Sequence, residues 1–243
     1  MGKLDDKVAI VTGGSRGIGK GIARGLLGEG ARVVIASRNA DALQEAADDL
    51  GGGDGILAVP TDVSDETQVA SLFDQTVERY GRVDILVNNA GAFNGGPIDE
   101  LEVSDFDHVI AVNLRGPFLC TREAMRMMKE QGDGGKILNI GSISAQRVRP
   151  NSAPYSTSKH GLWGLTQVTA LEGRDYGIAC GCLHPGNVNV ERREASTRET
   201  DQEPMMSVDE LAEVAVAMVV APKHMNVLEA IALPLGQKYI GRG

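Results

Sequence analysis

Tyr155 and Lys159 have the residue types and the spacing for proton transfer. They stand four positions apart in a segment, 152–175, that we expect to be helical, and this spacing puts both side chains on one helix face. A tyrosine hydroxyl ordinarily has a pKa of about 10, and a neighbouring ammonium favours the phenolate. The pair therefore has the chemistry of a general acid/base at neutral pH, although the same spacing is also common in helix surface pairs without a catalytic role.

Further polar side chains follow predicted strands or interrupt a predicted helix. Ser142 comes after the strand 137–140, and Asn89 comes after the strand 85–87, both at the carboxyl edge where open α/β sheets bind ligands. Asn113 interrupts the apolar face of a helical stretch near 104–130. A buried amide needs hydrogen-bond partners, so a structural role for Asn113 is an alternative to a catalytic one.

A glycine-rich turn runs from Thr12 to Gly19, directly after the predicted strand 8–11 and at the start of a predicted amphipathic helix. Glycines at this place allow a tight turn, close packing of helix on strand, and approach of a pyrophosphate to the free N–H groups at the helix N-terminus. The turn therefore predicts a dinucleotide site, with contacts from Gly13, Ser15, Arg16, Gly17, Ile18 and Gly19.

The end of the second predicted strand indicates which dinucleotide binds. An NAD site usually has an acid there to bind the ribose 2′-hydroxyl. This chain has Ser37 and Arg38 instead, and Arg16 lies in the glycine turn opposite. Because a guanidinium suits a 2′-phosphate, this pattern favours NADP(H) over NAD(H), unless both arginines are only solvated loop residues.

Apolar strands alternate with helical stretches along the chain. The predicted strands are 8–11, 33–35, 56–59, 85–87, 137–140, 178–183 and 228–233, and the helix after the third begins near Ser64 as a candidate N-cap. Such alternation is typical of a doubly wound parallel sheet in three layers, a Rossmann-like α/β fold. No linker divides the chain, so we expect one domain, 1–243, with the polar segment 190–207 as a substrate lid.

Composition excludes several functions. The 243 residues carry a net charge of −9, and an acidic surface repels nucleic-acid backbones and anionic lipids. No apolar run reaches the roughly 18–20 residues of a membrane span, and the N-terminus lacks a signal segment, so we expect a cytoplasmic protein without membrane partners. The three cysteines and four histidines match no metal-site spacing, so we expect reduced core cysteines and no bound metal.

Taken together, these motifs resemble the short-chain dehydrogenase/reductase family, in particular its 3-oxoacyl-ACP reductase-like members, over roughly residues 5–190. The resemblance implies that Tyr155 is the general acid/base, that Lys159 favours its phenolate and holds the nicotinamide ribose, and that Ser142 polarises the substrate oxygen. It further implies that Asn113 supports a water in a proton relay. The remaining cofactor contacts that it implies come from Asp62, Val63, Asn89, Ala90, Gly91, Pro185, Gly186 and Val188.

Two places depart from the pattern of the family. Val190 stands where many members have a threonine that holds the nicotinamide carboxamide, so this contact must be lost or replaced. The segment 233–237, Leu-Pro-Leu-Gly-Gln, stands where many members have Asp-Gly-Gly near a tetramer contact. The resemblance still implies a homodimer or homotetramer.

The sequence therefore predicts an NADP(H)-dependent oxidoreductase that interconverts a ketone or aldehyde and an alcohol, with a small-molecule substrate and hydride transfer to or from nicotinamide C4. Two alternatives stay open. One is an NAD-dependent alcohol dehydrogenase of the same family, and the other is a dinucleotide-binding protein without turnover. The identity of the substrate and the physiological direction do not follow from the residues.

Overall fold

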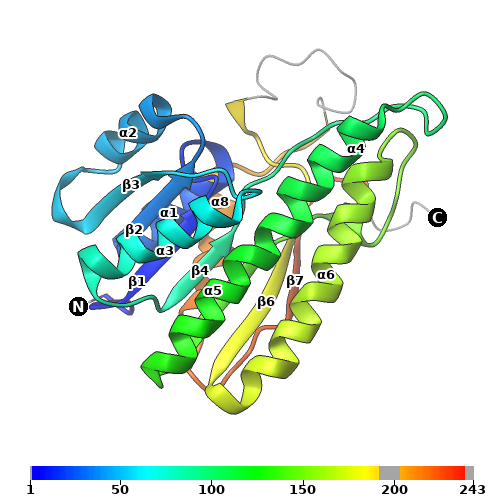
Figure 1. The fold of residues 1–243 in the computed structure, drawn as a ribbon. Coiled ribbons are helices and arrows are strands. Elements are labelled where there is room, and N and C mark those ends of the chain that lie inside the picture. Colours follow the sequence, from blue (N-terminus) through cyan, green and yellow to red (C-terminus); the bar gives the residue numbers. More distant parts are fainter. Residues whose placement is uncertain (1, 192–202, 239–243) are drawn as a thin grey trace.

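A seven-stranded parallel sheet forms the centre of the computed structural model, which describes residues 2–191 and 203–238 (Figure 1). The strands lie in the order β3-β2-β1-β4-β5-β6-β7. Their bounds are β1 (Val8–Thr12), β2 (Arg32–Ser37), β3 (Ile56–Pro60), β4 (Ile85–Asn88), β5 (Gly135–Ile140), β6 (Ile178–Pro185) and β7 (Glu229–Ala232). The predicted strands are thus all present, and the doubly wound arrangement is confirmed.

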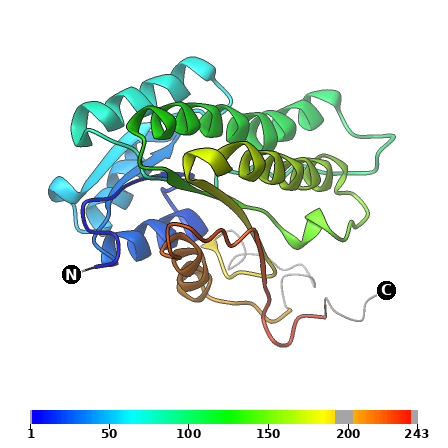
Figure 2. The ribbon, with the colours of Figure 1, turned by 90° about the horizontal axis from the view of Figure 1, so that it is seen from below.

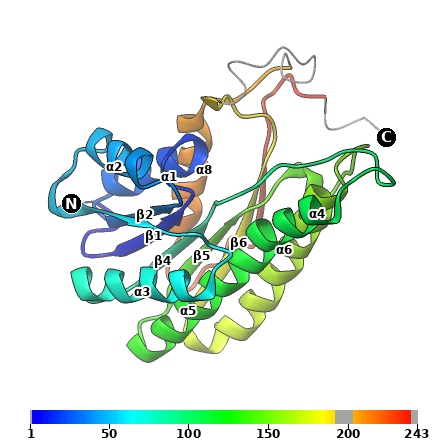
Figure 3. The same cartoon turned by 45° about the horizontal axis from the view of Figure 1, so that its top comes forward.

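The strand order reverses between β1 and β4. From β1 the chain proceeds outward to β2 and β3, then returns to the other side of β1 and continues from β4 to β7. Val11 of β1 pairs with Ile35 of β2 on one side and with Val87 of β4 on the other. At such a reversal the connections leave in opposite directions and open a crevice at the carboxyl ends of the strands. The loops that follow the strands gather along this edge of the sheet (Figure 3).

Helices cover both faces of the sheet, and two hydrophobic cores result (Figure 2). Adjacent residues of a strand point to opposite faces. Val11 accordingly packs in one core, whereas Ile10 packs in the other. The core that contains Val11 is covered by α1 (Gly17–Gly28), α2 (Ala40–Asp49) and α8 (Val208–Val219). The core that contains Ile10 is covered by α3 (Glu66–Tyr80), α5 (Gly116–Gln131) and α6 (Ala153–Gly173).

The predicted helical stretch near 104–130 is present with one irregularity, whereas the predicted N-cap of the third helix was wrong. The helical stretch near 104–130 is α4 (Val103–Ile110) followed by a π-helical turn at Ala111–Arg115 before α5, rather than one regular helix. The N-cap of α3 is Asp65 and not Ser64, because the Asp65 carboxylate accepts hydrogen bonds from the backbone N–H groups of Thr67 and Gln68. The Ser64 hydroxyl instead donates to Asp62 at 2.7 Å.

Cys120, Cys180 and Cys182 are all free and buried, in agreement with the expectation of reduced core residues. No helix among the described residues is long and apolar enough to cross a membrane. Within the same residues, no group of three or more His, Cys, Asp or Glu side chains has the arrangement of a metal site.

Candidate active site

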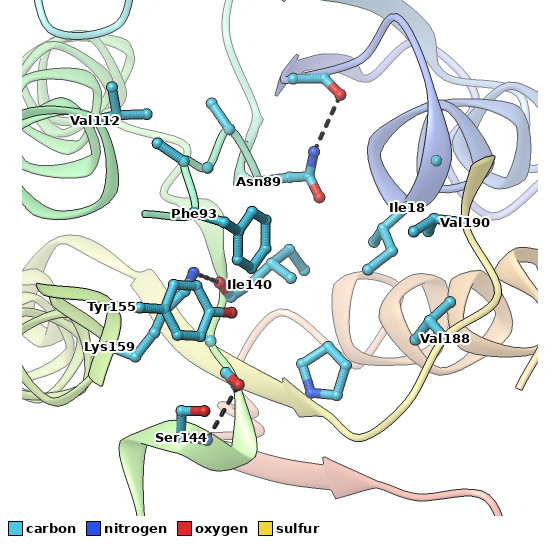
Figure 4. Close-up of a pocket in the computed structure, with 18 of the residues that line it drawn as sticks. Ile18, Asn89, Phe93, Val112, Ile140, Ser144, Tyr155, Lys159, Val188 and Val190 are labelled. Carbon is cyan, nitrogen blue, oxygen red and sulfur yellow. Dashed lines mark hydrogen bonds between the residues drawn. The ribbon is translucent and has the colours of Figure 1, made fainter. Parts of the chain in front are cut away.

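A large cleft, of about 1710 Å³, lies at the carboxyl edge of the sheet. Figure 4 shows Tyr155 and Phe93 on one side of it and Ile18 and Val190 on the other. All but two of the site residues expected from the sequence line this cleft, namely Gly13, Ser15, Arg16, Gly17, Ile18, Ser37, Arg38, Asp62, Val63, Asn89, Ala90, Gly91, Ser142, Tyr155, Lys159, Pro185, Gly186 and Val188. The exceptions are Gly19 and Asn113.

The end of the cleft predicted to be catalytic, called the catalytic end below, has Tyr155 and Lys159 on the first turns of α6. The Lys159 ammonium lies 5.7 Å from the centroid of the Tyr155 ring, so both groups share one helix face. Lys159 is only 5% exposed, and its Nζ donates a 2.7 Å hydrogen bond to the backbone carbonyl of Ile140 at the end of β5. This bond aims a buried positive charge at the phenol. The Phe93 ring stacks on the Tyr155 ring with centroids 4.7 Å apart.

Ser142 stands beside this pair, where β5 ends. Its Oγ accepts a 3.1 Å hydrogen bond from the N–H of Ser144 and thereby caps the short 3₁₀ turn Ile143–Ala145. A hydroxyl that accepts from one neighbour keeps its own O–H free to donate. The backbone of Ser142 contacts the imidazole of His184, a residue to which the sequence gave no role.

Asn113 lies in the π-helical turn and outside the cleft lining, with 1% of its surface exposed. Its amide accepts a 2.7 Å hydrogen bond from the N–H of Ala92 and donates to the Ala92 carbonyl at 3.0 Å. It also donates to Ser158 Oγ at 3.2 Å. These contacts are those of the structural alternative, since they join the segment after β4 to α6 close to Tyr155. A part in a water relay stays a prediction.

The opposite end of the cleft is built largely from backbone. Gly13 has φ +65°, and its N–H donates to the Ala36 carbonyl at 2.7 Å, which sets the turn between β1 and α1. The Asn89 side chain supports this turn by donating to the carbonyls of Thr12 and Gly13 at 2.9 and 3.1 Å. A Cβ on Gly19 would lie 2.2 Å from the Gly13 carbonyl oxygen. Gly19 therefore serves close packing rather than direct contact.

The N-terminus of α1 faces the cleft without a side-chain cap or an acid in its first turn. The N–H of Gly17 instead donates to Glu191 Oε1 at 3.2 Å. Free N–H groups and the helix dipole favour an anion at this place. The Glu191 carboxylate thus sits where the sequence predicts a pyrophosphate.

The side of the cleft where the sequence predicts the adenosine is formed by the ends of β2 and β3. Ser37 Oγ is buried there and has no hydrogen-bond partner within the described structure, an uncommon situation for a buried hydroxyl. Arg38 is exposed at the cleft rim. Burial raises the pKa of Asp62, but the hydrogen bonds from Ser64 and the charge of Arg38 outweigh it and hold this pKa below its ordinary value. The strand end therefore offers an unsatisfied hydroxyl beside a guanidinium.

Three segments meet at the side of the cleft next to Pro185. The N–H of Asn187 donates to Gln237 Oε1 at 2.8 Å, and its side-chain amide donates to Glu203 Oε2 at 3.1 Å. Val188 forms an isolated parallel bridge with Met206. Of the lid expected at 190–207, both flanks therefore contact the cleft region, whereas 192–202 lie outside the described residues.

Sequence reasoning missed Phe93, and it missed the partners of Asn187 and His184. Phe93 follows the Asn89–Gly91 segment by two residues, and an aromatic ring so close to predicted ligand-binding residues was the available signal. Asn187 and His184 flank the Pro185-Gly186 pair, so their positions were known although their partners were not. Those partners, Gln237, Glu203 and Ser142, lie 50, 16 and 42 positions away.

Comparison with known proteins identifies the class. The short chain dehydrogenase family model matches residues 7–201. The uncharacterized oxidoreductase YxjF of Bacillus subtilis is 35% identical over 93% of this chain and 88% of its own length. A 3beta-hydroxysteroid dehydrogenase of Mediterraneibacter gnavus is 37% identical over 82% of this chain and 72% of its own. The crystal structure of 3-ketoacyl-(acyl-carrier-protein) reductase from Brucella melitensis, complexed with NADH, has a TM-score of 0.87 at 31% identity and covers 94% of this chain and 97% of that one.

The chain belongs to the short-chain dehydrogenase/reductase family. The resemblance and the Rossmann-like fold expected from the sequence are thereby confirmed. The protein is an oxidoreductase that uses a nicotinamide dinucleotide and acts on CH–OH groups.

Proposed function

We propose that this protein is an NADP(H)-dependent oxidoreductase that interconverts a ketone or aldehyde with an alcohol, with Tyr155 as the general acid/base. The observation that carries the proposal is the buried Lys159 ammonium, which faces the Tyr155 phenol inside the cleft while its hydrogen bond to Ile140 holds it in place. A binding protein without turnover has no need of a phenol beside a buried cation.

The residues of the cleft fit a dinucleotide. The turn at Gly13 and the N-terminus of α1 would receive the pyrophosphate, and the unpartnered Ser37 hydroxyl would receive a group on the adenosine ribose. Asp62 and Val63 would contact the adenine, and Pro185 to Val188 the nicotinamide. Bound there, the nicotinamide supplies or accepts the hydride at C4, which is chemistry that no side chain provides.

The chain's own residues would position the substrate and move its proton. In the direction of reduction, the Tyr155 hydroxyl donates its proton to the substrate oxygen as negative charge develops there. The Lys159 ammonium stabilises the phenolate that remains. Ser142 donates a hydrogen bond from its O–H to the same oxygen and keeps its proton, because its lone pair already accepts from the Ser144 N–H. In oxidation the proton transfer at Tyr155 is reversed.

The preference for NADP(H) rests on the end of β2. No carboxylate is present at Ser37 or Arg38 to bind a ribose 2′-hydroxyl, and the guanidinium of Arg38 favours a 2′-phosphate. The second candidate is an NAD(H)-dependent enzyme, which the NADH complex of the Brucella melitensis reductase favours.

Titration of the purified protein with NADPH and separately with NADH, followed by nicotinamide fluorescence, tests the cofactor proposal. We expect NADPH to bind at least about tenfold more tightly, a difference of about 1.4 kcal/mol. Equal or tighter binding of NADH would favour the second candidate. Binding of neither nucleotide would contradict both.

Tyr155→Phe tests the role of the phenol. The variant keeps the ring that stacks on Phe93 and loses only the hydroxyl. We expect turnover with a panel of small ketones and aldehydes to fall by about 10²–10⁴-fold while the Kd for NADPH stays within twofold, the latter being an order-of-magnitude allowance. Unchanged turnover would remove Tyr155 from the mechanism.

We also propose that the protein forms a homodimer or homotetramer. Support comes from three exposed apolar side chains on helices of the same face, Phe118 on α5 and Val168 and Leu171 on α6, which are 48%, 51% and 63% exposed. Light scattering of the purified protein measures the mass, and a value of one chain at micromolar concentration would contradict the proposal.

A further inference from the structure

His184 is a fully buried titratable residue that the proposed mechanism does not use. It is the penultimate residue of β6, directly before Pro185. Its Nδ1 lies 3.2 Å from the backbone nitrogen of Ser142 and 2.9 Å from the backbone oxygen of the same residue. The imidazole therefore touches both backbone polar groups of the residue whose hydroxyl is proposed to hold the substrate oxygen.

The other nitrogen of His184 faces a carboxylate. Nε2 is buried without a hydrogen-bond partner in the described structure, and the carboxylate oxygen Oε1 of Glu229 on β7 lies 3.5 Å from it. That carboxylate oxygen also accepts a 2.6 Å hydrogen bond from the Gln146 side chain. Glu229 is thus held near His184 from the far side, although it is 35% exposed.

The two contacts at Nδ1 require opposite tautomers. If Nδ1 carries the proton, it donates to the Ser142 carbonyl; if Nε2 carries it, Nδ1 accepts from the Ser142 N–H. A carboxylate beside Nε2 favours the proton on that nitrogen. The 2.9 Å contact with the Ser142 carbonyl favours the proton on Nδ1, whereas the charge of Glu229 beside Nε2 favours the state in which Nδ1 accepts from the Ser142 N–H.

Burial lowers the pKa of His184. The hydrogen bond with the Ser142 backbone and the charge of Glu229 both raise this pKa, but the effect of burial is larger. Lys159 on α6 lowers the pKa further. The imidazole is therefore neutral at neutral pH. When the pH falls through its lowered pKa, Nδ1 gains a proton and can no longer accept from the Ser142 N–H.

We propose that His184, held as its Nε2–H tautomer by Glu229, is a positioning residue that fixes the backbone of Ser142 and so aims the Ser142 hydroxyl at the substrate oxygen. The inference rests on the role of Ser142 in the proposed function. His184 acts through Ser142 and is not among the residues that line the cleft.

The tautomer can be measured without any turnover. Nitrogen-15 NMR of protein labelled at histidine separates protonated from unprotonated ring nitrogens. We expect the buried imidazole to carry its proton on Nε2 in the parent protein and to shift toward the Nδ1–H form in Glu229→Gln. A parent protein in the Nδ1–H form, or a tautomer that ignores Glu229→Gln, would overturn the proposal.

Trp163 gives a second readout, because it is the sole tryptophan of the chain and its ring meets His184 edge-on at 5.7 Å. Protonated imidazole quenches indole emission. We expect the emission to fall on acidification with a midpoint below the ordinary histidine pKa of about 6.5, and kcat to fall with the same midpoint. Emission and kcat that titrate at different pH values would contradict a link between His184 and the reaction.

Kinetics of two substitutions separate positioning from packing. His184→Asn keeps a polar atom near the place of Nδ1, whereas His184→Leu keeps the bulk and loses both nitrogens. We expect kcat to fall about tenfold or more in His184→Leu, to recover most of its value in His184→Asn, and the Kd for NADPH to stay unchanged in both. Cys180→Ala, on the same strand and equally buried, is the matched control and should leave kcat unchanged. Equal losses in the Asn and Leu variants would indicate packing alone.

Two further variants keep the proposal testable if His184→Leu does not fold or if Ser142 has no catalytic role. If His184→Leu fails to fold, Glu229→Gln alters the same contact from a partly exposed position, and an unchanged kcat there would overturn the proposal. Ser142→Ala retains the backbone N–H, so the tautomer and the emission titration should be those of the parent. If Ser142→Ala also retains full activity, the proposed role of Ser142 fails, and the NMR result still decides the state of His184.

Discussion

The two ends of the cleft are built in different ways. The end proposed to bind the pyrophosphate, or phosphate end, is made of backbone groups. Its turn at Gly13 is fixed by the Ala36 carbonyl and by the Asn89 amide. The catalytic end is made of side chains, and each is held by a contact from another element, as Lys159 is by the end of β5. An end made of backbone is damaged by added volume, whereas an end made of side chains is damaged by a lost functional group.

The largest effect is expected at the catalytic end. Lys159→Met keeps most of the buried volume and removes the charge, so we expect kcat to fall by about 10²–10⁴-fold with a cooperative thermal transition retained. Steady-state kinetics and a thermal melt measure the two quantities. Lys129→Met, which removes a lysine from the surface of α5 near Tyr176, is the control and should keep full activity. Parent-like kcat in Lys159→Met would mean that the cation is not needed.

The phosphate end should respond to a single methyl group. Gly19→Ala places a Cβ 2.2 Å from the Gly13 carbonyl oxygen and 2.4 Å from Asn89 Nδ2, so we expect a loss of about 1–3 kcal/mol in unfolding free energy and weaker binding of NADPH. Chemical denaturation and a nucleotide titration measure these changes. Gly28→Ala lies in the same helix with nothing within 4 Å of its Cβ, and it should be neutral or stabilising. The same loss in both variants would argue against the steric explanation.

A smaller and selective effect is expected at Arg38. Arg38→Ala should weaken NADPH binding by about tenfold, because it removes a cation from the place of the 2′-phosphate, and should leave NADH binding unchanged. Arg24→Ala, which removes an exposed arginine paired with Asp209 outside the cleft, should change neither. If both nucleotides weaken equally, Arg38 acts through general charge and does not read the phosphate.

The smallest effect should be a gain. Glu191→Gln removes the negative charge that the Gly17 N–H now binds, so an incoming pyrophosphate no longer competes with a carboxylate at the helix N-terminus. Helix-terminus charges contribute about 0.3–1 kcal/mol, which predicts roughly two- to fivefold tighter NADPH binding. The gain should shrink at high salt. Weaker binding in the variant would show that Glu191 assists the nucleotide.

The comparison also explains what the sequence could and could not predict. Buried parallel strands are apolar on both faces, and Val8–Thr12 is buried throughout, so short apolar runs located all strands within a few residues. The glycine turn was equally visible, because its meaning depends on neighbours in sequence. The glycine turn of the phosphate end is thus visible in the local sequence, whereas the Asn89 amide that supports it lies 77 positions away.

The catalytic end depends on contacts between distant segments. Asn113 bonds to Ala92, which is 21 positions away, so the apolar pattern near 104–130 contained no sign of the π-helical turn. His184 meets Ser142 across 42 positions, and its partner Glu229 comes from the edge strand β7. Residue types identified Tyr155, Lys159 and Ser142, but the groups that hold them in place required the folded chain.

The buried cysteines allow the opening of a helix and of a strand to be followed separately during unfolding. Burial raises the pKa of Cys120 on α5 and of Cys182 on β6 to about 12, so the reactive thiolate hardly forms while the fold is closed. A thiol reagent will therefore label only molecules that have transiently opened. Mapping the label to Cys120 or to Cys182 as the denaturant concentration rises would reveal whether α5 opens before strand β6, without any engineered probe.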